Sequence, residues 1–186
     1  EFRVCSSDLG FGLNATYKGF DMSMFFNFMY DFDVLNANKI MLTTWADNKE
    51  NNFLMDIASD KRWRNFDDMG NEIRYSPEVL AEFNKNATMW NPTSIGRPIC
   101  MSYAVEDGSF LRLNSATLGY TLPSVWTKKV GLSKVRFYVS GNNLFTLTGY
   151  SGYDPEVNIA TGLTPNIDYN RYPRSRTYTF GAQLTF

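Results

Sequence analysis

The stretch YPRSRTYTFGAQLTF, residues 172–186, alternates in polarity from Thr177 to its end. The apolar residues of this alternation are Tyr178, Phe180, Ala182, Leu184 and Phe186, and the residues between them are polar or glycine. Because successive side chains of a β-strand point to opposite faces, the pattern predicts a strand with one apolar and one polar face. Such a strand suits a soluble β-sandwich, in which the apolar face meets a second sheet. It equally suits an outer-membrane barrel, in which that face meets lipid and the polar face lines the lumen.

The overall composition argues against several classes of function. The chain of 186 residues carries 18 Lys and Arg against 19 Asp and Glu, so its charge gives no indication of nucleic-acid binding. It contains no histidine, which is the commonest general base and zinc ligand. Its two cysteines, Cys5 and Cys100, are too far apart in the sequence to suggest a disulfide scaffold or a metal site. We therefore expect no enzymatic activity, no metal and no cofactor.

The hydropathy of the chain leaves a membrane barrel open. No run of eighteen or more apolar residues occurs, which argues against a transmembrane helix. The strands of a membrane barrel average to unremarkable hydropathy, so a mean hydropathy of -0.32 does not exclude that fold. The aromatic fraction of 16% is high, as both sheets and the aromatic girdles of membrane barrels favour.

Five segments are predicted to be strands, namely residues 9–17, 20–30, 109–122, 134–145 and 175–186. The first two are separated by Lys18 and Gly19, a two-residue turn typical of a β-hairpin. In the third, Leu118 lies on the apolar face with the other even-numbered residues. Leu111 and Leu113 are odd-numbered, so in a regular strand they would point to the opposite face. Either a β-bulge separates the two halves of this strand, or its outer half stands above the lipid.

The connections between the predicted strands alternate between short and long, the long ones being 31–108 and 146–174. In an antiparallel meander these two classes fall at opposite ends of the sheet. Outer-membrane barrels have short periplasmic turns and long extracellular loops, so we expect both long segments to be extracellular. A short helix is predicted to start at Pro77. Five strands cannot close a barrel, because the smallest have about eight, so we expect the chain to be part of a larger barrel.

Three stretches closely resemble the C-terminal barrel strands of the SusC/RagA family of TonB-linked outer-membrane transporters of Bacteroidetes. They are EDGSFLRLNSATLGYTLP (106–123), KVRFYVSGNNLFTLTGYSGYDPE (134–156) and the opening stretch, in that order. LGFGLNATYKGFDMSMFF (9–26) resembles a hairpin upstream in the same family. The resemblance implies an all-β, antiparallel transmembrane barrel of about 22 strands, to which residues 1–186 would contribute the C-terminal portion.

The resemblance also implies a function and a set of partners. Members of the family import glycan oligosaccharides or peptides across the outer membrane, with energy delivered through the TonB complex. A SusD-like surface lipoprotein caps the barrel, and outer-membrane lipid surrounds it. The plug and the TonB-contacting segment of the family are not recognisable in this sequence. A receptor or adhesin barrel without transport is the alternative function.

Two sets of residues are expected to serve assembly and anchoring. A terminal aromatic on an alternating strand resembles the signal read by the barrel-assembly machinery, and Tyr178, Phe180, Leu184 and Phe186 would carry it. The alternative is that these side chains only contact lipid. Trp126, Lys128 and Lys129 in the short connector 123–133 suit a membrane-interface anchor, with an aromatic ring at headgroup depth and cations beyond it.

A third set, in the 146–174 loop, is a candidate for contact with a sugar or peptide ligand or the lid. These residues are Tyr150, Tyr153, Asp154, Glu156, Tyr169 and Tyr172. Aromatic rings offer flat apolar faces and carboxylates accept hydrogen bonds. The interpretation that we favour is that GYDPE only folds its own loop, since Asp-Pro favours a turn. Four arginines at the predicted lumen or rim would either attract anionic cargo or, as we favour, form structural pairs with carboxylates of the plug. They are Arg112, Arg136, Arg174 and Arg176.

Overall fold

The computed structural model describes residues 8–44, 52–57, 60–94, 99–157 and 166–186. The chain divides into two compact units. The first contains residues 1–34, 106–167 and 171–186, and the second contains residues 35–105 and 168–170. No helix in the described part of the chain is both long and apolar enough to cross a membrane.

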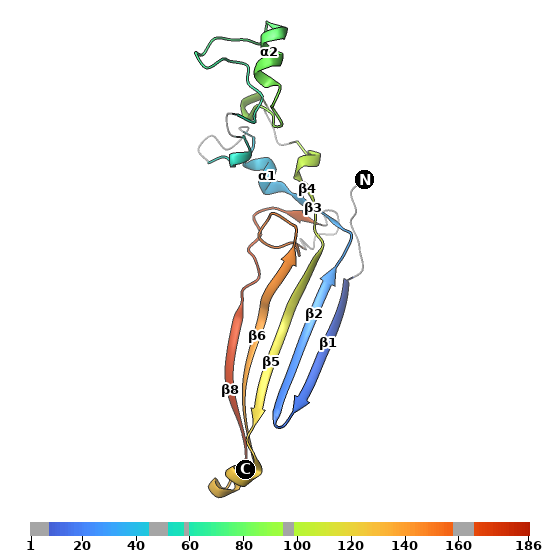
Figure 1. Ribbon diagram of the computed structural model, residues 1–186, viewed down its shortest axis with the longest axis vertical. Helices are drawn as coiled ribbons and strands as arrows, with labels where there is room; N and C mark the ends of the chain where they lie inside the picture. The colour runs from blue at the N-terminus through green and yellow to red at the C-terminus, as the bar shows by residue number, and fades with distance from the viewer. Residues whose placement is uncertain (1–7, 45–51, 58–59, 95–98, 158–165) are drawn as a thin grey trace. The chain divides into compact units, whose positions relative to one another are not determined.

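The first unit is built on one antiparallel sheet of five strands in the order β1-β2-β5-β6-β8 (Figure 1). The strands are β1 (Asp8–Tyr17), β2 (Phe20–Met29), β5 (Phe110–Thr121), β6 (Lys134–Thr148) and β8 (Thr177–Thr185). Each strand pairs with the next of the five along the chain, so the sheet is a meander. The predicted antiparallel sheet of five strands is therefore confirmed.

The turn between β1 and β2 has the geometry that its sequence demands. Lys18 and Gly19 have φ values of 45° and 90°, and a two-residue hairpin turn with positive φ at both positions matches the twist of the flanking strands. Gly19 is also required sterically, because a Cβ there would lie 2.9 Å from the carbonyl oxygen of Thr121.

The strand registers place most of the large apolar side chains of the sheet on one face. Leu13 is opposite Met24, Leu118 opposite Val139, and Val139 opposite Phe180, so the apolar set continues from strand to strand. This apolar face is formed by Leu9, Phe11, Leu13, Ala15 and Tyr17; Phe20, Met22, Met24, Phe26 and Phe28; Leu111, Leu113, Ala116, Leu118 and Tyr120; Val135, Phe137, Val139, Phe145 and Leu147; and Tyr178, Phe180, Ala182 and Leu184. Many of these side chains are exposed to a degree unusual for a core, for example Leu13 at 52% and Phe180 at 79%.

A bulge explains the change of parity within β5. The pairing with β6 shifts register between Leu113 and Ser115. On β6 the pairing goes from Phe145 to Asn142, and Asn143, which lies between these two residues, has a φ of 52°. The irregularity lets Leu111 and Leu113 join the same face as Leu118. The bulge, one of the two explanations that the sequence leaves open, is therefore present.

Phe25 is one of a few large apolar residues, with Met29, Phe110 and Tyr138, on the mainly polar face. Its ring lies over two glycines of the neighbouring strand, because a Cβ on Gly10 would be 2.7 Å from Phe25 Cζ, and one on Gly12 would be 3.9 Å from Cδ2. A glycine in a strand leaves its pairing partners without side-chain cover, and an aromatic ring from the adjacent strand supplies it. Phe25 thus interrupts the polarity of this face for a local packing reason.

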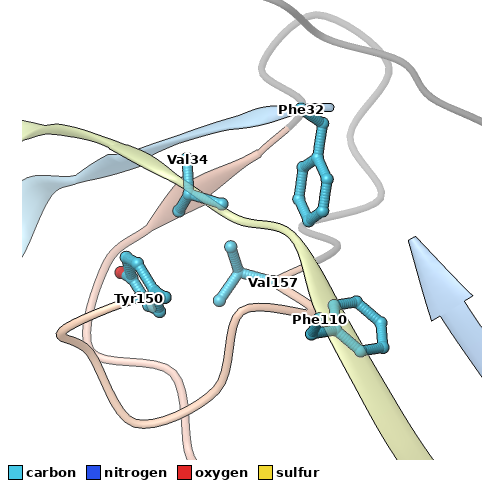
Figure 2. Close-up of a cluster of buried hydrophobic side chains, with 5 residues drawn as sticks. All are labelled: Phe32, Val34, Phe110, Tyr150 and Val157. Atoms are coloured by element: carbon cyan, nitrogen blue, oxygen red, sulfur yellow. The ribbon is translucent and has the colours of Figure 1, made fainter. Parts of the chain in front are cut away.

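A small hydrophobic cluster forms in the first unit at the end of the sheet where β5 begins and β6 ends. It contains Phe32, Val34, Phe110, Tyr150 and Val157, all under 7% exposed, and Met29 packs against it. Figure 2 shows Val157 between Tyr150 and Phe110. Residues from both long connections therefore fold against the end of β5.

Three short strands, β3 (Asp33–Asn36), β4 (Val105–Asp107) and β7 (Ile167–Asp168), form a second sheet in the order β4-β3-β7.

The second unit is mostly irregular, with short helices. They are α1 (Ala37–Met41), η1 (Met55–Ile57), α2 (Pro77–Asn84), η2 (Pro92–Ser94) and η3 (Ser102–Ala104). The predicted helix at Pro77 is confirmed as α2. Asn84 at its end is buried and accepts a hydrogen bond from the Arg64 backbone N–H at 2.6 Å. Trp90 donates its indole N–H to the Thr43 carbonyl at 3.0 Å. Most of the segment predicted as a loop, residues 35–105, thus belongs to a compact unit of its own.

Candidate functional site

An ion pair crosses three strands on the polar face of the sheet. Arg136 of β6 donates from Nε to Asp21 Oδ1 at 2.9 Å and from Nη2 to Asp21 Oδ2 at 2.5 Å, although Asp21 lies two strands away on β2. The guanidinium passes over Gly119 of β5, where a Cβ would lie 2.5 Å from Arg136 Nη2. Two parallel charge-assisted hydrogen bonds are the strongest arrangement of such a pair. Gly119 is therefore the residue that makes this bridge sterically possible.

A second cluster of charged side chains lies near the start of β5. Arg112 is 1% exposed, and its Nη2 donates to Asp154 Oδ1 at 2.5 Å while Nη1 lies 3.3 Å from Glu156 Oε2. Arg174 donates from Nη2 to Glu156 Oε1 at 2.5 Å. Burying a guanidinium is costly unless it is paired, and the two carboxylates of the 149–157 loop supply that pairing. Arg112 thus fixes the loop to the sheet.

The same loop is held by two further carboxylate contacts. Asp154 Oδ1 also accepts the backbone N–H of Glu156 at 3.0 Å, which closes a tight turn around Pro155. Glu106 accepts the backbone N–H and the hydroxyl of Ser151, each at 2.9 Å. Tyr150 lies in the hydrophobic cluster just before this turn (Figure 2). The GYDPE segment is therefore anchored at both ends.

A cavity of about 240 Å³ lies beside this anchored loop, entirely within the first unit. The residues around it come from β5, β6, the loop and the segment that leads into β8. They include Arg112, Thr146, Tyr153, Pro155, Arg174 and Arg176. Arg176 is exposed and forms no ion pair or hydrogen bond with any residue that the structure describes.

The structure divides the six loop residues named from the sequence. Tyr150, Asp154 and Glu156 belong to the buried cluster and the ion-pair network. Tyr153 lines the cavity and is 84% exposed. Tyr169 and Tyr172 are 54% and 88% exposed and do not line it, and Tyr169 belongs to the second unit. Arg112, Arg136 and Arg174 form structural ion pairs, but with Asp154, Asp21 and Glu156 of this chain rather than with the plug carboxylates expected from the sequence.

The residues expected to serve assembly and anchoring are exposed at the ends and surface of the sheet. Tyr178, Phe180 and Leu184 lie on the apolar face, and Phe186 is 88% exposed. Between β5 and β6 lie α3 (Ser124–Thr127) and η4 (Lys128–Val130). They carry Trp126, which is 60% exposed, and the exposed Lys128 and Lys129. Figure 1 places α3, the β1–β2 turn and the C-terminus at the same end of the sheet.

Three contributors to these clusters were missed in the sequence. Asp21 is the acceptor for Arg136 although 115 positions separate them, and Glu106 holds Ser151 across 45 positions. The sequence gives no reason for a glycine at position 119. The reason is the Arg136 guanidinium, which lies where a Cβ on residue 119 would be. The sequence does contain one indication of the Arg136–Asp21 pair. Both residues are predicted to lie on the polar faces of nearby strands, at the same end of the sheet.

The second unit contains one exposed turn with a perturbed carboxyl group. Asp67 accepts hydrogen bonds from the Asn71 side chain at 2.9 Å and from the backbone N–H groups of Asn71 and Met69 at 2.8 and 2.9 Å. These donors, the Asn71 amide foremost, hold the pKa of Asp67 below its usual value because they stabilise the charged form. Among the described residues there is no group of three or more Cys, Asp or Glu that could hold a metal ion.

No protein-family model matches the chain. TonB-dependent receptor P3 of Formosa agariphila is 34% identical to it over 184 residues, which cover 96% of the chain. TonB-dependent receptor SusC of Bacteroides thetaiotaomicron is 38% identical over 88 residues, or 45% of the chain. The RagAB peptide importer in its open-open state matches the whole chain with a TM-score of 0.70 at 24% identity. The chain belongs to the SusC/RagA family of TonB-dependent receptors.

The chain corresponds to a small part of these SusC/RagA relatives. It spans 16% of receptor P3, 8% of SusC and 18% of the RagAB chain. A second structure, of the RagAB peptide transporter, covers 95% of the chain with a TM-score of 0.66 at 26% identity. The five-stranded sheet is therefore a segment of a transmembrane β-barrel of the outer membrane. In barrels of this kind the apolar face of the wall meets lipid and the polar face lines the interior, and we expect the same of this sheet.

Proposed function

We propose that the chain is part of the wall of a TonB-dependent importer that carries a nutrient, an oligosaccharide or a peptide, across the outer membrane. The observation that carries the proposal is the two-faced sheet. One face carries exposed apolar side chains. The other face carries polar side chains and the Arg136–Asp21 ion pair. This sheet occurs in a chain whose relatives are named TonB-dependent receptors. A polar lumen bounded by a lipid-facing wall is what passage of a hydrophilic nutrient requires.

The proposal includes an orientation. The short connections, at Lys18–Gly19 and through α3 and η4, would lie in the periplasm, and residues 31–108 and 146–174 would lie outside the cell. Trp126, Lys128 and Lys129 would then anchor the periplasmic interface, with the exposed Trp126 ring at headgroup depth. In this orientation the GYDPE loop and its cavity lie toward the extracellular mouth.

The proposal also includes partners. A SusD-like lipoprotein would cover the extracellular mouth, and TonB would act through parts of the protein that lie outside this sequence. The barrel-assembly machinery would read the end of β8, where Phe186 is 88% exposed. Tyr153, Tyr169 and Tyr172 are the exposed tyrosines of the 146–174 loop that would contact cargo or lid.

Uptake by cells that express the full-length receptor tests the function. Radiolabelled oligosaccharides and peptides are offered to cells with and without the receptor gene, each with TonB active or deleted. We expect saturable uptake of one class of cargo only when both the receptor and TonB are present. Binding of cargo at the cell surface without TonB-dependent accumulation would instead indicate a receptor or adhesin without transport.

A further inference from the structure

We propose that the cavity beside the GYDPE loop binds a carboxylate group of the imported cargo. The inference rests on the proposed import function, since it assigns a chemical feature to the cargo. The cavity lies at the end of the strands where the 149–157 loop is anchored, and Arg112, Arg174 and Arg176 all line it.

The charge of the cavity favours a monoanion. Three guanidinium groups line it, and the carboxylates paired with them are those of Asp154 and Glu156. Three positive charges against two negative charges leave one positive charge unbalanced. The geometry assigns that excess to Arg176, which makes no ion pair with any described residue. An arginine fork matches the two oxygens of a carboxylate, so an acid group is the simplest ligand that would balance the site.

The buried Arg112 gives the cavity a fixed positive wall. Its side chain is 2% exposed; Nη2 donates a hydrogen bond to Asp154, while Nη1 lies 3.3 Å from Glu156 Oε2 without forming a hydrogen bond. Its Nε and Nη1 are buried donors with no hydrogen-bond partner among the residues that the structure describes, and Glu156 Oε2 is a buried acceptor without one. A buried donor without a partner is costly, and a ligand oxygen or a ligand-bound water would satisfy it. This is a second feature of the cavity, independent of the excess charge, that points to an acceptor ligand.

The remaining walls suit a small acid group attached to a longer molecule. Pro155 and Pro173 have fixed backbone φ angles and so restrict movement of the rim. Tyr153 is 84% exposed, and its hydroxyl is a further donor at the mouth. At about 240 Å³ the cavity is smaller than the roughly 300–1,000 Å³ of pockets that enclose a whole small molecule, so it fits one end of the cargo.

Binding of trifluoroacetate, a simple carboxylate, to the purified full-length receptor is the first test, with ¹⁹F NMR as the readout. We expect a saturable change in the ¹⁹F signal that Arg176→Gln weakens by about tenfold, because a charge-assisted hydrogen bond is lost. The matched control is Arg62→Gln, which removes an exposed arginine that does not line the cavity and should leave binding unchanged. No saturable binding by the wild type, or equal effects of the two variants, would overturn the proposal.

Two pairs of larger probes distinguish the sources of the carboxylate. Tetra-alanine is compared with its C-terminal amide, and a glucuronate-ended disaccharide with its neutral glucose counterpart, by calorimetry. A preference for the free acid that disappears in Arg176→Gln identifies a peptide or a sugar acid as the cargo class. The inference fails independently of the import function if the receptor shows TonB-dependent uptake of neutral cargo but no preference for acids. If no cargo accumulates in a TonB-dependent manner, the import function itself is wrong.

Discussion

Asp21 of β2 and Arg136 of β6 are joined by two hydrogen bonds that pass over Gly119 of the strand between them. The bridge ties three neighbouring strands together on the polar face of the sheet. Because the pair is bidentate, it fixes the relative positions of β2 and β6 as well as neutralising two charges.

Substitution of Gly119 should break this bridge. In Gly119→Ala the new Cβ would lie 2.5 Å from Arg136 Nη2 and 2.6 Å from Asp21 Oδ1, so the guanidinium must move. We expect the full-length receptor to lose about 1–3 kcal/mol of unfolding free energy, as overpacked sites generally do. Urea unfolding in lipid vesicles measures this. Gly149→Ala is the matched control, because a Cβ at Gly149 meets nothing within 4 Å. Equal midpoints for the two variants would show that the bridge contributes nothing.

Tyr150 and Tyr153, both of the same loop, should respond differently to truncation. Tyr150 is 6% exposed in the hydrophobic cluster, whereas Tyr153 is 84% exposed. We expect Tyr150→Ala to lower the opening free energy of the 149–157 loop by about 3–5 kcal/mol, the usual cost of deleting a buried aromatic side chain. Tyr153→Ala should change it by less than about 0.5 kcal/mol. Amide hydrogen exchange at Ser151 and Val157 reports the loop opening. Similar exchange in both variants would mean that the cluster does not hold the loop.

Two adjacent residues of β8 test which face of the sheet meets lipid. Phe180 lies on the apolar face and Thr179 on the polar face, near the middle of the strand. Phe180→Lys should destabilise the receptor by about 2–4 kcal/mol, the cost of a cation on the lipid face near the bilayer midplane. Thr179→Lys should cost much less. The folded fraction, measured by heat-modifiable migration of the outer-membrane receptor on gels, gives the comparison. The reverse order would place lipid on the other face.

The end of the chain is predicted to direct assembly. Phe186 is 88% exposed, so its side chain contributes little packing to the described part of the fold. We expect Phe186→Ala to reduce the amount of folded receptor in the outer membrane several-fold while leaving the urea midpoint of the folded fraction unchanged. Thr185→Ala is the neighbouring control. A lowered midpoint with normal assembly would assign Phe186 to stability instead.

The sequence predicts the sheet well because alternation is a local property. The strict pattern of residues 177–186 and the Lys18–Gly19 turn indicate β8 and the first hairpin without any distant information. The parity change in β5 shows that something happens near residue 114, but the bulge becomes definite only through the register with β6. Alternation can be recognised within one segment of the sequence, whereas the register depends on which residues of two different strands pair.

The ion-pair networks and the second unit depend on distant contacts, which a single sequence does not reveal. Arg112 and Asp154 are 42 positions apart, and Trp90 and Thr43 are 47 positions apart. Residues 31–108 show no sustained periodicity, so their folding into a packed unit cannot be inferred from pattern. Pro77 is the exception, because a proline at the first helical position marks α2 locally.

Spin labels on two neighbouring residues of β1 test the central claim most directly. Leu13 lies on the apolar face and Asn14 on the polar face, and both side chains are exposed in the five-stranded sheet. Labels are attached to Leu13→Cys and Asn14→Cys in the full-length receptor in native outer membranes, and their collision rates with oxygen, which concentrates in lipid, are measured. High oxygen accessibility at position 13 and low accessibility at position 14 is the predicted result. Equal accessibility at both positions would contradict a lipid-facing barrel wall.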